Sequence, residues 1–164
     1  MKQIEIERKF LIEMPDINFL MSLDGCAITK IFQTYTSNNI RIRKCIKDNK
    51  ESYIKTIKRK ISDMSRIEEE SEITKEEYTA LLAFADQGRK TLPKTRYAIP
   101  YNNKVLEIDI FPFWRKQAFL EIELESENEE FSLPDFIKII KEVTFESQYK
   151  NYSLAKNIPE EENF

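Results

Sequence analysis

The chain has 164 residues, of which 41% are hydrophobic and 34% are charged, a composition typical of one globular domain with a sizeable core. Its 26 basic and 29 acidic side chains give a net charge of -3, which argues against a nucleic-acid partner, since that affinity needs a net basic surface. No apolar stretch has the length of a membrane span or the form of a secretory signal, so we expect a cytoplasmic protein that does not bind membranes.

Three absences narrow the chemistry further. The sequence contains no His, which removes the commonest general base and the commonest zinc ligand. Cys26 and Cys45 lie far apart and lack a Cys-x-x-Cys spacing, so we expect reduced thiols and no zinc site. Only Gly25 and Gly88 are present, too few for a glycine-rich phosphate loop. Any phosphate would therefore have to be held by side chains.

Alternating polar and apolar residues, separated by turn residues, predict a series of β-strands along the chain. The predicted strands cover residues 4–12, 29–36, 40–47, 51–60, 65–73, 89–99, 105–111 and 119–125, with a strand-like piece at 143–145. Their number and spacing favour an antiparallel sheet that closes into a barrel.

A few helices are expected between and after these strands. Asp16 is predicted to cap a short helix that ends near Leu23, and Thr74 with Glu77 forms a capping box for a helix that ends near Gly88. Further helical segments are predicted at 133–142 and 149–157, and a flexible tail at 158–164. The chain is thus expected to be a single α+β domain, residues 1–164, with its core at about 4–155.

Charged residues recur two apart in the predicted strands and are sorted by sign. In the first strand Glu5 and Glu7 share one face, opposite Ile4 and Ile6. Further acidic pairs are Glu68/Glu70, Glu107/Asp109 and Glu121/Glu123, and the basic pairs are Arg41/Arg43 and Lys94/Arg96. A solvated face would mix the two signs for solubility, so the segregated pairs indicate charges that face one another across a lumen.

So many charges in a small lumen need partners, because burial of an unpaired ion costs several kcal/mol. Carboxylates gathered without His or Cys favour hard cations, Mg²⁺ or Mn²⁺. Arg and Lys side chains opposite them suit phosphate oxygens. The pattern therefore predicts a tunnel that binds a polyanion together with a divalent metal.

The segment Glu5-Ile-Glu7-Arg-Lys9 resembles the ExExK signature of the CYTH superfamily, the triphosphate tunnel metalloenzymes. The resemblance continues in the family's order through Arg41-Ile-Arg43, Lys58, Glu68-Glu-Glu70, Lys94-Thr-Arg96-Tyr97, Glu107-Ile-Asp109, Glu121-Ile-Glu123, Glu142-Val-Thr144 and Tyr149-Lys150-Asn151. It implies an eight-stranded antiparallel barrel whose tunnel binds a small-molecule triphosphate with Mg²⁺ or Mn²⁺. The small bacterial members that it resembles hydrolyse inorganic tripolyphosphate and sometimes nucleoside triphosphates, whereas others are adenylate cyclases or thiamine triphosphatases.

The resemblance, together with the sorted charges, suggests a role for each residue. Triphosphate binding is expected of Lys9, Arg41, Arg43, Lys58, Lys94, Arg96 and Lys150. Metal binding is expected of Glu5, Glu7, Glu70, Asp109, Glu121 and Glu123. Catalysis, with a water oriented for in-line attack, is expected of Lys9, Glu68, Glu70 and Asp109. Lys55 and Lys58 lie on opposite faces of the same predicted strand, and Lys55 stays an alternative to Lys58 as the phosphate-binding lysine. Lys156 likewise stays an alternative to Lys150.

Triphosphate hydrolysis is the leading functional interpretation, because the sequence contains no sign of an adenine pocket or of an extra domain. Adenylate cyclase activity is the first alternative, since it would use the same metal and triphosphate groups. A non-catalytic polyphosphate-binding module is the second, although mere anion binding would not need the acidic pairs. The sequence leaves open which triphosphate is bound and whether the protein is a monomer or a homodimer.

Overall fold

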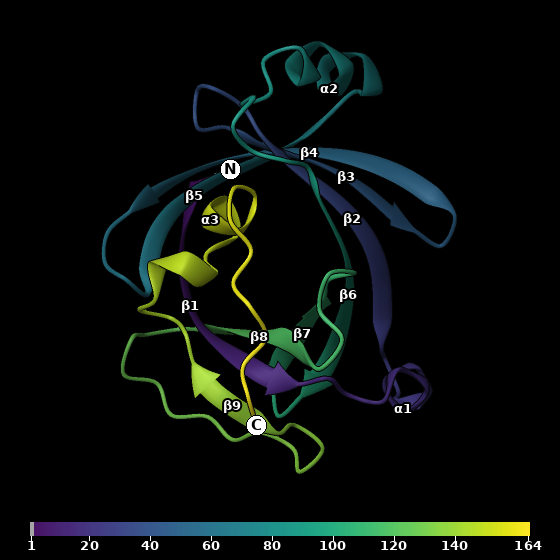
Figure 1. Ribbon diagram of the computed structural model, residues 1–164, viewed down its shortest axis with the longest axis vertical. Coiled ribbons are helices and arrows are strands. Elements are labelled where there is room, and N and C mark those ends of the chain that lie inside the picture. Colours follow the sequence, from purple (N-terminus) through teal and green to yellow (C-terminus); the bar gives the residue numbers. More distant parts are fainter. Residues whose placement is uncertain (1) are drawn as a thin grey trace.

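A computed structural model describes residues 2–164 and shows a closed antiparallel barrel (Figure 1). The strands are β1 (Lys2–Glu13), β2 (Ala27–Tyr35), β3 (Arg41–Lys47), β4 (Lys50–Lys60), β5 (Ser65–Ile73), β6 (Leu92–Tyr101), β7 (Lys104–Ile110), β8 (Gln117–Leu124) and β9 (Ile139–Glu142). Their order in the sheet is β5-β4-β3-β2-β6-β7-β8-β1-β9, and β1 also pairs with β5. That last pairing closes an eight-stranded barrel with β9 added outside it, which confirms the predicted α+β barrel.

Tight turns join several neighbouring strands. Asp48 and Asn49, between β3 and β4, have φ values of 51° and 61°, and Asn102 and Asn103, between β6 and β7, have 46° and 60°. Asn and Asp tolerate this left-handed region better than other non-glycine residues, and two such residues in succession match the twist of a hairpin. Both turns lie in the gaps between predicted strands, 40–47 and 51–60 for the first and 89–99 and 105–111 for the second.

The helices are short: α1 (Ile17–Ser22), α2 (Lys75–Leu82), α3 (Asn151–Leu154) and the 3₁₀ helix η1 (Ser147–Tyr149). The Asp16 carboxylate caps α1 by accepting from the Asn18 backbone N–H at 2.9 Å, and the Thr74 hydroxyl caps α2 by accepting from the Glu77 N–H at 3.1 Å. Both predicted caps are thus present, although α2 ends sooner than expected. None of the helices in residues 2–164 is long and apolar enough to cross a membrane.

The predicted helix at 133–142 is wrong, because its last four residues form β9 instead. In β9, Lys141 and Glu142 lie opposite Leu11 and Phe10 of β1. The apolar spacing of this segment fits a helix, but the β1 backbone offers pairing partners that local sequence does not reveal. The predicted strand piece at 143–145 is also wrong, since the strand ends at Glu142 and a turn follows.

The apolar faces of the strands point outward and are covered in two places. Leu20 of α1 and Ile137 belong to a cluster on the outer faces of β1, β6, β7 and β8. Tyr78 of α2 packs with Ile42 and Tyr53 on the outer faces of β3 and β4. These two layers form the outer core, so the inner face of the barrel is left to the charged residues.

One end of the lumen is closed by apolar side chains. Leu11 of β1, Phe119 of β8 and Phe111, which directly follows β7, pack there with Tyr149 of η1 and Leu154 of α3. Figure 1 shows η1 and α3 lying across this opening of the barrel. The lumen is therefore blocked at this end by the C-terminal part of the chain.

The C-terminal residues, predicted to form a flexible tail, make specific contacts with the barrel. The Trp114 indole N–H donates to the Pro159 carbonyl at 3.1 Å, and the Glu161 carboxylate accepts from the Lys116 backbone N–H at 2.6 Å. The Tyr149 hydroxyl donates to Glu162 at 2.7 Å. These contacts attach the tail to the same end of the barrel that η1 and α3 close.

Candidate active site

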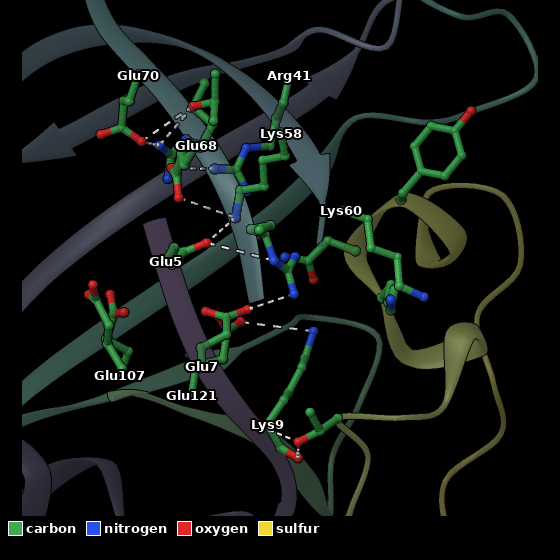
Figure 2. Close-up of a pocket in the computed structure, with 18 of the residues that line it drawn as sticks. Glu5, Glu7, Lys9, Arg41, Lys58, Lys60, Glu68, Glu70, Glu107 and Glu121 are labelled. Carbon is green, nitrogen blue, oxygen red and sulfur yellow. Dashed lines mark hydrogen bonds and ion pairs between the residues drawn. The ribbon is translucent and has the colours of Figure 1, made fainter. Parts of the chain in front are cut away.

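The lumen holds a cavity of about 730 Å³, lined mainly by charged side chains. Alternation along the strands places these side chains, since each charged pair occupies successive inward positions of one strand. Figure 2 shows Glu5, Glu7 and Lys9 of β1 together with Arg41 of β3 and Lys58 of β4. Carboxylates and cations from different strands thus meet in one space.

The structure brings all but two of the predicted site residues to this cavity. Those that line it are Glu5, Glu7, Lys9, Arg41, Arg43, Lys58, Glu68, Glu70, Arg96, Glu121, Glu123 and Lys150. Lys58 lines the cavity and Lys55 does not, which resolves the alternative that the strand pattern left open. Lys150 likewise lines it, whereas Lys156 does not.

Lys94 and Asp109 are the two exceptions, because they lie buried beneath the cavity wall. Their side chains are 1% and 0% exposed, and Lys94 Nζ donates to Asp109 Oδ2 at 2.8 Å. Arg96 donates to the same carboxylate from Nε at 2.7 Å and from Nη2 at 2.9 Å. The expected metal and catalytic role of Asp109 therefore does not fit its position: both of its oxygens serve to hold Arg96, which does line the cavity.

Burial also sets the protonation of this pair. Burial lowers the pKa of Lys94 to about 8, although the Asp109 carboxylate partly opposes that shift. Burial alone would raise the pKa of Asp109, but the charges of Arg96 and Lys94 outweigh it and keep the pKa below its ordinary value. Asp109 is thus the counter-ion that keeps two cations charged at the base of the site.

Arg41 and Arg43 form the basic wall on β3. Arg43 Nη2 donates to Glu70 Oε2 at 2.7 Å, and Arg41 Nη2 lies 3.9 Å from Glu68 Oε1. The Nε–H groups of both arginines are buried and have no hydrogen-bond acceptor within residues 2–164. Buried donors are normally satisfied, so these two groups indicate that an anionic ligand supplies the acceptors.

Carboxyl groups from β1, β5 and β8 form the acidic part of the site. The carboxyls of Glu5 and Glu68 are hydrogen-bonded to each other, and so are those of Glu7 and Glu121. Burial, together with the neighbouring carboxylate, raises the pKa of Glu7 to about 8 and that of Glu68 to about 7. Near neutral pH the Glu7/Glu121 pair therefore retains a proton in place of a second counter-ion, and the Glu5/Glu68 pair is only partly protonated.

These carboxyl pairs also contact cations of the protein. Lys58 Nζ lies 3.0 Å from Glu5 Oε2 and 3.7 Å from Glu68 Oε2. Arg66 Nη2 lies 3.7 Å from Glu7 Oε1. Within residues 2–164, no three carboxylates are close enough to hold a metal ion by themselves.

The oxygen donors nevertheless fit a hard divalent ion. Mg²⁺ is commonly held by one or two carboxylates, with substrate phosphates and water as its remaining ligands. The Glu7/Glu121 pair offers this arrangement, and Glu121 Oε1 is buried without a hydrogen-bond donor in the described part of the chain. The donor set thus suits Mg²⁺ or Mn²⁺ bound together with a phosphate ligand.

Several lining residues were given no role by the sequence interpretation. Arg66, two residues before Glu68 on β5, contacts both Glu5 and Glu7. Its strand parity, shared with Glu68 and Glu70, could have indicated it. Glu107 was expected to face the lumen as one of an acidic pair, and it does line the cavity, but the sequence assigned a role only to Asp109.

Fold and site together define a closed tunnel barrel whose lumen is lined by opposed cations and carboxylates. No family model and no curated protein matches the sequence. Among solved structures, the inorganic triphosphatase NE1496 is 26% identical, with a TM-score of 0.53 over 95% of this chain and 97% of that chain.

Two more distant structures share the fold. A proposed adenylate cyclase from Bacillus halodurans is 18% identical, with a TM-score of 0.52 over 77% of this chain and 83% of that one. A conserved hypothetical protein from Pyrococcus furiosus is 19% identical, with a TM-score of 0.53 over 76% and 80%. These likenesses show that the fold is shared, and the sequence motifs of the chain resemble those of the CYTH superfamily.

Proposed function

We propose that this protein is a metal-dependent triphosphatase that holds inorganic tripolyphosphate, or the triphosphate group of a nucleotide, in the barrel lumen and hydrolyses a phosphoanhydride bond. The observation that carries the proposal is the pair of buried Nε–H groups of Arg41 and Arg43, which face a charged cavity without an acceptor in residues 2–164. The 26% identity with an inorganic triphosphatase over nearly the whole length of both chains supports the same activity.

The cations would bind the phosphate oxygens. Arg41 and Arg43 offer planar guanidinium groups that suit phosphate, and Lys58 lies on the neighbouring strand β4 as a point charge. Lys9 and Lys150 line the same cavity. Because phosphoryl transfer depends mainly on positioning and on charge stabilisation, this set of donors would supply most of the protein's contribution.

A divalent ion would be held by Glu5, Glu7, Glu121 and Glu123, with Mg²⁺ or Mn²⁺ as the candidates. When bound, such an ion neutralises phosphate oxygens and assists attack on the phosphorus. Arg66 contacts the Glu7 carboxyl and would leave it when a metal takes its place.

A carboxylate would accept the proton of the attacking water, since the sequence contains no His. Glu68 is placed for this role, because its carboxylate lies 3.7 Å from Lys58 Nζ and 3.9 Å from Arg41 Nη2, two of the proposed phosphate-binding groups. Glu70, two residues further along β5, would hold Arg43 in position through their 2.7 Å contact.

Product identification tests the proposal. The purified protein is incubated with tripolyphosphate, ATP or thiamine triphosphate in Mg²⁺ or Mn²⁺, and the products are separated by ion chromatography. We expect phosphate and pyrophosphate from tripolyphosphate. Cyclic AMP from ATP would identify a cyclase instead, and an absence of turnover with all three substrates would identify a binding module.

The free thiols of Cys26 and Cys45 are in keeping with the cytoplasmic setting that we also propose.

A further inference from the structure

The side chain of Lys9 is held in the lumen by the C-terminal part of the chain. Lys9 Nζ donates to the Tyr149 backbone carbonyl at 2.9 Å and lies 3.9 Å from the centroid of the Phe119 ring. Its distance of 3.9 Å to Glu121 Oε1 is too long for a hydrogen bond. An ammonium group has several N–H donors, so the carbonyl fixes the direction of the side chain and leaves the other donors to a ligand.

The C-terminal tail in turn fixes Tyr149. This residue is buried, and its hydroxyl donates to Glu162 Oε1 at 2.7 Å. The same carboxylate oxygen lies 2.8 Å from Lys141 Nζ on β9, and the Glu162 backbone N–H donates to Oε1 of the fully buried Gln117 at 2.9 Å. Figure 1 shows the last residues of the chain running from α3 toward β9. Glu162 thus connects η1 to two strands, β8 and β9.

From this geometry we infer that Glu162 is a positioning residue for the active site. Through the Tyr149 hydroxyl it holds the Tyr149 carbonyl, and that carbonyl directs the Lys9 ammonium at the bound triphosphate. The inference rests on the proposed function, in which Lys9 binds a phosphate oxygen. A 3₁₀ helix of three residues, such as η1, is too short to fix its own position, so its side-chain contacts decide where its carbonyl groups lie.

The side chains of Tyr149 and Glu162 lie outside the cavity lining. A change of either one therefore reaches the ligand only through residues that do line the cavity. Lys9 is the lining residue whose side chain Tyr149 contacts directly, by its backbone carbonyl. Substitutions of Tyr149 and Glu162 thus test the position of Lys9 without removing a group that would touch the triphosphate.

Tyr149→Phe is the most selective variant, because it keeps the ring and the backbone carbonyl and removes only the hydroxyl. Tyr53→Phe is the matched control, since the Tyr53 hydroxyl also donates to a carboxylate, that of Glu51, but packs on the outer face of the barrel. Glu162→Ala removes the other partner of the bond. The conservative Glu162→Gln retains an oxygen that can accept from the Tyr149 hydroxyl.

The probe is imidotriphosphate, an analogue of tripolyphosphate that resists hydrolysis, titrated calorimetrically in Mg²⁺. Loss of a hydrogen bond to a charged group weakens binding about tenfold or more, which is the loss expected in Lys9→Met. A misdirected ammonium keeps part of its attraction, so we expect a loss of about threefold or more in Tyr149→Phe and Glu162→Ala. Tyr53→Phe should lose no affinity, and Glu162→Gln should recover most of what Glu162→Ala loses.

A double variant separates positioning from a purely structural role. In the Lys9→Met background the Tyr149 carbonyl has no ammonium to direct, so the addition of Tyr149→Phe should cause no further loss of affinity. The inference is overturned if Tyr149→Phe binds the analogue as the wild type does, or if it weakens binding equally with and without Lys9. The proposed function stands in both cases. If the wild type binds no imidotriphosphate and hydrolyses no tripolyphosphate, the proposed function and this inference both fail.

Discussion

Asp109→Asn is expected to destabilise the protein strongly, although Asp109 does not line the cavity. The carboxylate accepts from Lys94 Nζ at 2.8 Å and from Arg96 Nε and Nη2 at 2.7 and 2.9 Å, and Asp109 is fully buried. Removal of one partner of a buried ion pair leaves an uncompensated charge and costs about 3–5 kcal/mol. Lys94 can avoid part of this cost by losing its proton, since burial already lowers its pKa to about 8.

Urea unfolding at pH 7 measures the loss. The free energy of unfolding of a small protein falls by about 2 kcal/mol per M of urea, so a cost of this size lowers the unfolding midpoint by about 1.5–2.5 M urea. Asp63→Asn is the matched control, because Asp63 is an exposed aspartate that pairs with Lys60. Screening by water makes such exposed pairs weak, so the control should shift the midpoint far less.

A double variant tests the cause. Asp109→Leu combined with Lys94→Met replaces the buried pair by apolar side chains and should recover the part of the lost stability that comes from Lys94. The part that comes from Arg96 should stay lost, because within residues 2–164 Arg96 then keeps only its hydrogen bond to Glu107. If Asp109→Asn unfolds at the same urea concentration as Asp63→Asn, the Asp109 carboxylate does not act as the buried counter-ion of Lys94 and Arg96, and this account of the wall is refuted.

Three further predictions follow from the charges of the site. The folded-state pKa of Asp109 lies below its ordinary value, so the stability that the Asp109 carboxylate contributes is fully present above about pH 4 and is lost as the pH falls through the folded-state pKa. The free energies of unfolding of the wild type and Asp109→Asn should therefore converge at low pH. Arg43→Ala should lower kcat/KM for tripolyphosphate about 100-fold or more. Arg59 lies on β4 outside the cavity, so Arg59→Ala should leave kcat/KM unchanged. Equal effects of the two substitutions would contradict the role of the basic wall. Chelation with EDTA should abolish hydrolysis. Glu7→Gln should raise the Mg²⁺ concentration that gives half the maximal rate, whereas Glu13→Gln, at an exposed position, should not. The same Mg²⁺ dependence in both variants would show that Glu7 is not a metal ligand.

Strand parity made the barrel and its lumen predictable from sequence. A two-residue period assigns each side chain to one face, and the sorting by sign showed that the charged face could not be the solvated one. For that reason Glu5, Glu7 and Lys9 were correctly expected to face inward with Arg41 and Arg43.

Depth along the lumen could not be predicted in the same way. Glu107 and Asp109 share a face of β7, but the register with β8 places Glu107 opposite Glu121 and Asp109 opposite Phe119. Phe119 belongs to the apolar cluster that closes the lumen. The stagger between strands, which parity does not contain, therefore decided which of the two acids reaches the cavity.

The helix predicted at 133–142 failed for a related reason. Its apolar spacing is compatible with a helix, but Lys141 and Glu142 find backbone partners on β1, more than a hundred residues earlier in the chain. Such pairing depends on the finished barrel and overrides local preference. The contacts of the C-terminal residues, such as that of Trp114 with Pro159, depend on the finished fold in the same way.

The central claim is that the lumen binds a triphosphate with a divalent ion, and a crystal structure with imidotriphosphate and Mn²⁺ tests it most directly. The account predicts phosphate density beside the Nε–H groups of Arg41 and Arg43, with an anomalous Mn²⁺ peak next to the carboxyls of Glu7 and Glu121. Phosphates bound only on the outer surface, or a lumen in which Arg66 still contacts Glu7 and no ion is present, would contradict it.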